Sequence, residues 1–368
     1  MTRMSLVPAP IAKLPWGVLA LVCGICGFGL VVLYSAAGGS LRPWALSQGV
    51  RFCAFLVGAL ILSRIRVETL KGLAVPGYVL LVGMLVGVEA LGAVAGGSRR
   101  WLDLGIIRLQ PSELMKPVIV LVLAWFYDML PAAEIRRWSA IWPAALLIGV
   151  PFLLVMAQPD LGTSLMIVFG GIVVMFLAGI PVRLFVGGIA ALVALIPVAL
   201  GMLHDYQRSR IEIFLNPESD PLGTGYHIIQ SKIAIGSGGI LGKGFLAGTQ
   251  SHLDYLPEGH TDFVFATMAE EWGLMGGVGL IVAYLMVILW GMRVAGRATT
   301  RFGRLAAGGL STTIFFYVAI NMSMVMGLAP VVGIPLPLVS FGGSAMMTVL
   351  ICLGLLIAID REGRDAAR

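Results

Sequence analysis

Long apolar runs alternate with short polar segments along almost the whole chain. The runs lie at residues 14–34, 44–62, 72–92, 112–130, 139–157, 162–179, 183–203, 272–292, 305–328 and 341–359. Each is close to the roughly 20 residues that a helix needs to cross the hydrocarbon core of a bilayer. The pattern therefore predicts an all-α polytopic membrane protein with about ten transmembrane helices, built as a single domain over residues 1–368.

Two of the connecting segments are too long for simple turns. Residues 93–111 combine glycines, paired arginines and an amphipathic WLDLGII stretch, which predicts a turn lying on the membrane surface. Residues 204–261 are rich in glycine but keep many Ile, Leu, Tyr and Phe residues, in which a merely solvating linker would be poor. This segment, between the seventh and eighth helices, is predicted to be an ordered loop with short helices.

The distribution of charge orients the chain in the membrane. Hydrophobic residues make up 58% of the chain and charged residues 12%, and most Lys and Arg fall in segments on the same side as both termini. Because basic segments stay cytoplasmic, the protein is predicted to be N-in and C-in, with the 204–261 loop outside. The pI near 9.3 then reflects contact with an anionic inner leaflet, and nucleic-acid binding is excluded.

An acid and a base stand together at the outer end of the fourth run, in QPSELMKP (110–117). Glu113 suits the positive end of a helix dipole, whereas Lys116 opposes it. The two are three residues apart on one helix face, and Pro117 cannot donate to the Glu113 carbonyl. Since ionisable groups in spans are costly and mark functional cavities by default, the pair is a structural ion pair, the lining of a substrate cavity, or both.

Three other features each have two explanations. Arg51, near the outer end of the second run, either snorkels to the interface or contacts a phosphate. Asp160, in the outer turn QPDLGTS, either caps a helix or belongs to the site. The last outer segment, Ala329–Ala345, has three prolines and paired glycines, so it forms a rigid loop or lines a cavity.

Four carboxylates border the eighth run: Glu258, Asp262, Glu270 and Glu271. The run 272–292 is uncharged and long enough to span alone, so these acids are predicted to occupy a watery or protein-lined recess at its outer mouth. In a helix, Glu270 would be displaced from Asp262 by about 12 Å along the axis. One working carboxylate, Asp262, therefore fits better than a two-acid hydrolase site.

Several stretches together resemble the SEDS (shape, elongation, division and sporulation) family. They are RRWLDLGIIRLQPSELMK (99–116), AQPDLGTS (157–164), the loop from 204 to 251, LPEGHTDFVFATMAEE (256–271) and PVVGIPLPLVSFGGSA (330–345). HTDFVF, QPSELMK and PLPLVSFGG are specific to this family, and the resemblance covers almost the whole chain. GTQSHLDYLPEGHTDF resembles the elongation members more than the division members.

The resemblance implies a ten-helix glycosyltransferase that polymerises lipid II into peptidoglycan strands for cell elongation and rod shape. It would act at the outer face of the bacterial cytoplasmic (inner) membrane, with a class B penicillin-binding protein, a transpeptidase, as partner. By similarity, Asp262 corresponds to the family's essential aspartate, and Glu113 with Lys116 to its intramembrane acid and base pair. A lipid II flippase is the alternative, since it would use the same polar cavity, but it does not require the long outer loop.

The chemistry of strand growth assigns roles to further residues. A sugar 4-hydroxyl attacks an anomeric carbon while undecaprenyl pyrophosphate leaves, so one carboxylate can accept the proton while cations stabilise the pyrophosphate. The candidate cations are Arg51, Lys116, Arg208, Arg210, Lys232 and Lys243. The other predicted cavity residues are Asp160, Glu258, His260 and Ser340. No cluster forms a recognisable metal site and no cofactor is expected, although a divalent cation at the pyrophosphate stays open.

Overall fold

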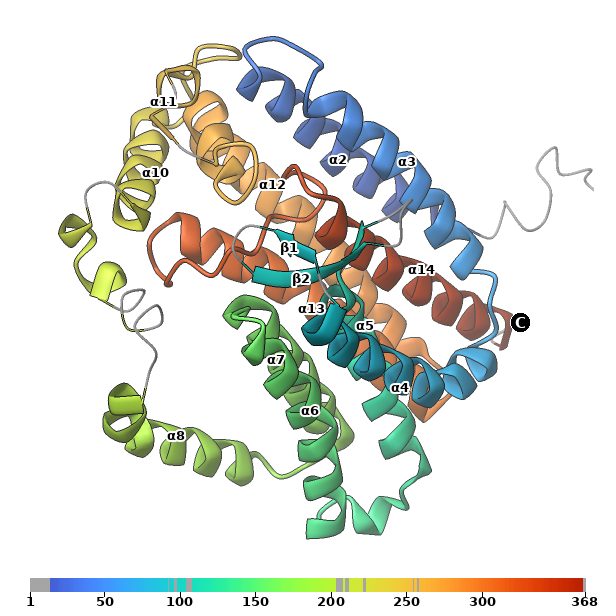
Figure 1. Cartoon of the computed structure of the whole chain (residues 1–368). Helices are drawn as coiled ribbons and strands as arrows, with labels where there is room; N and C mark the ends of the chain where they lie inside the picture. The colour runs from blue at the N-terminus through green and yellow to red at the C-terminus, as the bar shows by residue number, and fades with distance from the viewer. Residues whose placement is uncertain are drawn as a thin grey trace, which may run out of the picture.

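Ten long helices account for most of the described chain (Figure 1). The computed structural model describes residues 14–91, 93–95, 98–103, 108–202, 208, 212–220, 223–253, 255–256 and 258–366. The long helices are α2 (Trp16–Ala36), α3 (Ala45–Leu62), α4 (Val67–Leu91), α5 (Pro111–Met129), α6 (Trp138–Ala157), α7 (Leu161–Ala178), α8 (Val182–Met202), α12 (Val264–Arg297), α13 (Arg301–Val325) and α14 (Gly343–Ala366). Each overlaps one predicted apolar run, because a run of this length can satisfy its backbone in lipid only as a helix.

Eight of these helices are long and apolar enough to cross a membrane. Helix α5 is not among them, and it carries Glu113, Lys116 and Asp128. Helix α8 contributes only a shorter apolar stretch, 182–195, to that comparison. The protein is thus an all-α polytopic membrane protein, as predicted.

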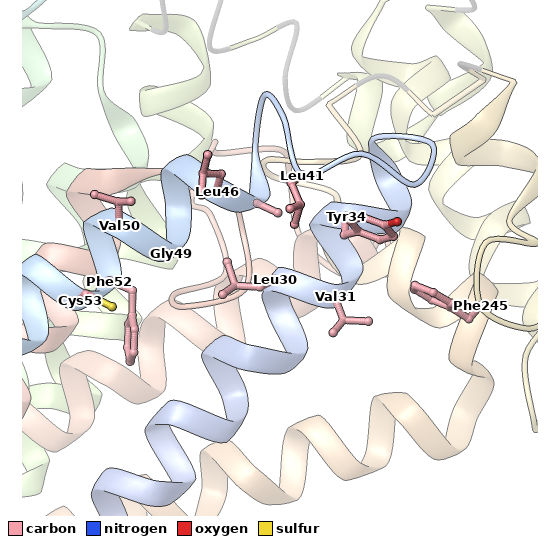
Figure 2. Close-up of a pocket in the computed structure, with 11 residues that line it drawn as sticks. Leu30, Val31, Tyr34, Leu41, Leu46, Gly49, Val50, Phe52, Cys53 and Phe245 are labelled. Atoms are coloured by element: carbon pink, nitrogen blue, oxygen red, sulfur yellow. The ribbon is translucent and has the colours of Figure 1, made fainter.

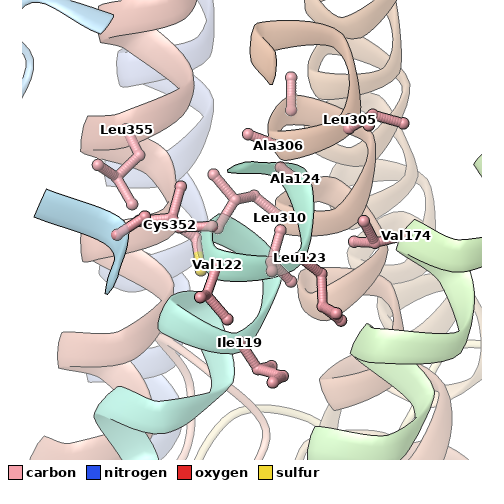
Figure 3. Packing of buried hydrophobic residues seen from close by; sticks show 14 of the residues in the cluster. Ile119, Val122, Leu123, Ala124, Val174, Leu305, Ala306, Leu310, Cys352 and Leu355 are labelled. Atoms are coloured by element: carbon pink, nitrogen blue, oxygen red, sulfur yellow. The ribbon is translucent and has the colours of Figure 1, made fainter. Parts of the chain in front are cut away.

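The core lies where α5, α7, α13 and α14 meet, and Figure 3 shows its Leu, Ile, Val and Ala side chains interlocking. Small residues let these helices approach closely. A Cβ at Gly309 of α13 would lie 2.6 Å from a methyl carbon of Val120 and 2.8 Å from one of Val174. Helices α13 and α14 are the most enclosed of the eight spans. In their most apolar 18-residue stretches, 72% and 78% are buried. They form the enclosed centre of the helix bundle.

The segment 93–111 contains strands, which differs from the predicted surface turn. Strands β1 (Ala93–Ala95), β2 (Ser98–Asp103) and β3 (Arg108–Leu109) form an antiparallel sheet in the order β1-β2-β3. From β2, Arg100 Nε donates to the carbonyl of Gln158 at 3.0 Å. The sheet is therefore bonded to the turn between α6 and α7. This is a long-range contact that no local sequence pattern predicts.

The long segment 204–261 holds short helices, as predicted. They are η2 (Pro217–Ser219), α10 (Thr224–Gly238) and α11 (Thr249–His252); another short one, η1 (Ala132–Glu134), precedes α6. Helix α10 packs on α12, and Ser231 Oγ donates to the Val325 carbonyl at the end of α13 at 2.7 Å.

Helix α12 is broken at Gly273, where φ is 62° and ψ is −162°. The N–H groups of residues 243–244 donate to the carbonyls of residues 270–271 at 3.0 Å, and those of residues 274–275 donate to the carbonyls of residues 239–240 at 2.9 and 3.1 Å. Residues 239–244 thus replace the helical hydrogen bonds lost at the break. The start predicted at 272 falls on this break, whereas the helix begins at Val264.

Candidate functional site

A tight turn, residues 258–263, presents the predicted aspartate just before α12. Glu258 has a positive φ of 56°, and its carbonyl accepts the N–H groups of Thr261 and Phe263 at 3.0 and 3.3 Å. Thr267, one turn into α12, donates its hydroxyl to the Gly259 carbonyl at 2.9 Å. These bonds fix the turn to the helix that follows it.

Asp262 projects from this turn toward the loop 329–342. A Cβ added to Gly333 would lie 3.6 Å from Asp262 Oδ2, so the absence of a side chain there leaves room beside the carboxylate. Burial first, and the charge of Glu258 second, raise the pKa of Asp262 to about 6. Asp262 is therefore a stronger base than an exposed aspartate, yet it is still largely ionised at neutral pH.

Asn321 of α13 joins the turn to the facing loop. Its Nδ2 donates to the backbone carbonyl of Asp262 at 2.9 Å and to that of Ile334 at 2.7 Å. The side chain is fully buried. Sequence reasoning did not single out Asn321, although an asparagine in an apolar span was a usable signal.

Helix α3 holds the other end of the same loop. Gln48 Nε2 donates to the Ser340 carbonyl at 2.7 Å, and Gln48 Oε1 accepts the Gly342 N–H at 3.3 Å. The predicted site residue Ser340 is buried, and its hydroxyl accepts the Leu336 N–H at 2.8 Å. In this conformation Ser340 shapes the loop.

His260 and Arg51 flank the loop through aromatic contacts. The His260 ring stacks on Trp44 with a centroid distance of 4.1 Å and an interplanar angle of 9°, and burial lowers its pKa while the charge of Glu258 opposes that shift. The His260 carbonyl accepts the Phe341 N–H at 2.8 Å. Arg51 Cζ lies 5.1 Å from the centre of the Phe341 ring. One exposed cation and one basic carboxylate thus border a single loop.

The predicted intramembrane ion pair is present and has two further members. Lys116 Nζ lies 2.5 Å from Glu113 Oε1 and donates to Tyr317 Oη at 2.8 Å. The Tyr317 hydroxyl donates to Glu113 Oε2. Thr348 Oγ1 lies 3.2 Å from Glu113 Oε2 and 3.3 Å from the Glu113 carbonyl that Pro117 leaves without a helical donor. Tyr317 and Thr348 were missed because they come from distant helices.

Asp160 forms the predicted helix cap. Its Oδ1 accepts the Thr163 N–H at 3.1 Å, and its Oδ2 lies 3.8 Å from Arg100 Nη1. Gln110 Nε2 donates to the same oxygen at 3.3 Å. Asp160 therefore joins the start of α7 to β2 and to the residue before α5.

Lys243 lies beside the break in α12 and pairs with Glu270. Its Nζ lies 2.6 Å from Glu270 Oε1 and donates to Thr249 Oγ1 at 2.8 Å. The backbone N–H groups of Thr249 and Gln250 also donate to Glu270 Oε1, at 2.9 and 3.0 Å. The recess predicted around Glu270 and Glu271 is thus protein-lined, with both acids buried.

The remaining predicted cations lie elsewhere. The side chain of Lys232, on α10, passes beside Gly327. Arg208 is exposed and its Nε lies 3.1 Å from Glu212 Oε1. Arg210 lies outside the described residues. Of the cation set, Arg51 borders the loop at Asp262, and Lys116 lies in the buried cluster.

A groove of about 620 Å³ runs between α2 and α3. Figure 2 shows its apolar lining, which includes Leu30, Leu46 and Phe52. At one end, Tyr34 stacks on Phe245 of the segment 204–261, with the ring centroids 6.2 Å apart. With hardly any polar group, this groove suits a hydrocarbon chain better than a chemical step.

The metal expectation stays a prediction. Within the described ranges, no three His, Cys, Asp or Glu side chains gather into a possible metal site. A divalent cation would therefore need substrate oxygens as additional ligands.

Comparisons with known proteins agree with this architecture. The model of the FtsW/RodA/SpoVE family, described as cell cycle proteins, matches residues 16–365. The peptidoglycan glycosyltransferase MrdB of Escherichia coli is 44% identical over 342 residues, which cover 93% of this chain and 92% of MrdB. The probable peptidoglycan glycosyltransferase FtsW of Geobacter sulfurreducens is 34% identical over 361 residues, 95% of each chain.

Two solved structures have the same fold. A chain from work on structural coordination of polymerization and crosslinking by a peptidoglycan synthase complex has a TM-score of 0.82 at 36% identity, covering 95% of this chain and 98% of that one. The rod shape determining protein RodA of Thermus thermophilus has a TM-score of 0.72 at 30% identity, covering 95% and 97%. The chain therefore belongs to the FtsW/RodA/SpoVE family.

Proposed function

We propose that this protein is a peptidoglycan glycosyltransferase that polymerises lipid II into glycan strands at the outer face of the cytoplasmic membrane, for cell elongation and rod shape. The observation that carries the proposal is the half-buried Asp262, whose pKa is raised to about 6 beside a side-chain-free position of the facing loop. The identity to a protein named peptidoglycan glycosyltransferase supports the reaction class.

Asp262 acts as the general base. The 4-hydroxyl of the acceptor sugar gives its proton to the Asp262 carboxylate as its oxygen bonds to the anomeric carbon of the donor. The bond from that carbon to the pyrophosphate oxygen breaks, and undecaprenyl pyrophosphate leaves with the electron pair. A base with a pKa near the working pH accepts a proton while remaining mostly ionised, which is what this step needs.

Arg51 is the best-placed cation for the pyrophosphate. Its guanidinium lies against Phe341 of the loop 329–342, the loop that Asp262 also faces, and a planar guanidinium binds phosphate oxygens in pairs. Lys243 is held by Glu270, and Arg208 by Glu212. The apolar groove between α2 and α3 would accept part of a polyprenyl chain.

The topology and partner extend this proposal. We place ten spans in the membrane with both termini in the cytoplasm, which puts Asp262 and the outer loop outside, where lipid-linked sugars are polymerised. The structural likeness to a chain of a peptidoglycan synthase complex that coordinates polymerization and crosslinking supports a class B penicillin-binding protein as partner.

Purified protein, alone and with a class B penicillin-binding protein, should convert labelled lipid II into strands separable on a gel. The same preparation in proteoliposomes distinguishes the flippase alternative by the accessibility of labelled lipid II from each side. Strands without net transport support the proposal. Transport without strands in either preparation would replace the enzyme with a flippase.

A further inference from the structure

Asn321 holds the candidate base through its backbone. One amide group donates to the carbonyls of Asp262 and Ile334, which belong to the turn before α12 and to the loop 329–342. The amide therefore fixes the spacing between Asp262 and Gly333. Without that amide, buried carbonyls lose their donor, which makes a shift of the turn favourable.

The buried ion pair is unsuited to direct contact with a substrate in this conformation. Lys116 is 1% exposed and Glu113 is 6% exposed. Lys116 is held by Glu113, by Tyr317 Oη and by the face of the Tyr317 ring, whose centre lies 4.5 Å from Nζ. The pair therefore holds Tyr317 through both its hydroxyl and its ring.

Tyr317 and Asn321 stand one turn apart on α13. Residues four apart lie on the same face of a helix, separated by about 6 Å along its axis. Both side chains are fully buried, and α13 has 72% of its apolar window enclosed. A tightly packed helix of this kind transmits a displacement at Tyr317 to Asn321.

We propose that Tyr317 and Asn321 form a positioning unit through which the Glu113–Lys116 pair sets the place of Asp262. The inference rests on the proposed function and gives the pair a role at a distance. Lys116 and Glu113 fix the ring and hydroxyl of Tyr317. The helical turn of α13 between Tyr317 and Asn321 then fixes Asn321, which holds the main chain of Asp262 against the loop 329–342.

Two variants test the unit, and a third is the matched control. Tyr317→Phe removes one hydroxyl, and Asn321→Leu keeps a similar volume while removing the donor. Thr313→Val removes a buried hydroxyl one turn before Tyr317, where it donates to the Gly309 carbonyl of its own helix at 2.9 Å. All three are purified as full chains, and the partner is added for activity measurements. Each variant is measured at the same number of degrees below its own thermal midpoint.

The first readout is hydrogen exchange of the backbone at residues 258–264, which needs no enzymatic activity. Exchange there should rise in Tyr317→Phe and in Asn321→Leu and stay at the wild-type rate in Thr313→Val. Unchanged exchange in Tyr317→Phe, or an equal rise in Thr313→Val, overturns the proposal. Because this readout is independent of catalysis, it decides the matter even where wild-type protein forms no strands and the proposed function fails.

The second readout is the kinetics of strand synthesis. Misplacement of a reacting group by about 1 Å can cost about 100-fold. The kcat should therefore fall about 10- to 100-fold in Tyr317→Phe and in Asn321→Leu, with KM changed by less than about 3-fold, and should stay near wild type in Thr313→Val. The double variant should be no worse than the more impaired single variant, since residues acting as one unit are not additive. Multiplicative losses would contradict the unit.

The pH profile separates positioning from general damage. Loosening the turn admits water to Asp262, so the acid limb of kcat should move to lower pH in both variants and stay in place in Thr313→Val. In the described part of the chain, the charged or titratable groups near the turn include Glu258 and His260 within it, His227 of α10, which stacks on Phe263, and Arg51, which lies against Phe341. The loop 329–342 has none. A fixed acid limb in both variants would contradict the mechanism.

Discussion

Removing one member of the Glu113–Lys116 pair should destabilise the protein far more than replacing both. The two charged atoms are 2.5 Å apart, with side chains 8% and 1% exposed. Breaking a buried ion pair by deleting one partner typically costs about 3–5 kcal/mol, because the other charge stays buried and unpaired, whereas replacing both is often neutral. Glu113→Gln and Lys116→Met should each lose free energy of unfolding of this order.

The neighbouring hydroxyl groups reduce this loss without cancelling it. In Lys116→Met, Tyr317 still donates to the carboxylate and Thr348 lies within hydrogen-bond distance. In Glu113→Gln, the ammonium keeps the Tyr317 oxygen and ring. Neither neighbour supplies an opposite charge, so both single variants stay well below wild type.

The test is a double-mutant cycle. The free energy of unfolding is measured in one detergent for wild type, both single variants and the double variant Glu113→Gln/Lys116→Met. The double variant should lie closer to wild type than either single variant. Lys71→Met is the control, since its pair with Asp128 is 2.6 Å long but partly exposed, and it should cost about 1 kcal/mol or less. A double variant that loses the sum of both single losses would refute the reasoning.

Three further results are expected. Strand synthesis should fall as pH drops through about 6, because protonation removes the Asp262 base, and Glu258→Gln should move this limb to lower pH by removing a nearby negative charge; a flat profile in initial-rate measurements would contradict the assignment. Gly273→Ala should lower the free energy of unfolding by about 1–3 kcal/mol through backbone strain, and by more because its Cβ would lie 2.5 Å from the Ile240 carbonyl. Gly279→Ala has open space around its Cβ and should unfold like wild type. In a background without native cysteines, Glu218→Cys should react with an impermeant thiol reagent in spheroplasts and Thr299→Cys should not; reversed labelling would contradict the N-in, C-in topology.

Hydropathy predicts the helices because bilayer thickness and backbone hydrogen bonding leave little choice for a long apolar run. The start of α12 was wrong by eight residues, at 272 in place of Val264. Glu270 and Glu271 look too polar for a buried helix. Glu270 is accommodated because Lys243 and the backbone of residues 249–250 supply its partners. Glu271 accepts the Ser35 hydroxyl from α2.

The site was predictable only where its members are close in the sequence. The pair Glu113 and Lys116 could be inferred from its spacing of three. Tyr317 and Thr348 could not, since they lie more than 200 positions away and both residue types are common in spans. Asn321 is one of two asparagines in the chain, but its carbonyl partners are set by tertiary packing alone.

The central claim is that the carboxylate of Asp262 removes the proton in glycosyl transfer. Asp262→Asn keeps the size of the side chain and leaves the backbone bond to Asn321 in place, so the variant should fold and bind lipid II as wild type does. Glu258→Gln, on the same turn, is the matched control and should lose less than about tenfold at neutral pH. General-base catalysis contributes about 10²- to 10⁴-fold.

The decisive measurement is therefore the rate of strand formation from labelled lipid II by purified wild type, Asp262→Asn and Glu258→Gln, each with equal amounts of the partner. The account predicts a loss of about 10²- to 10⁴-fold in Asp262→Asn alone. Strand formation at a near wild-type rate by well-folded Asp262→Asn would contradict it.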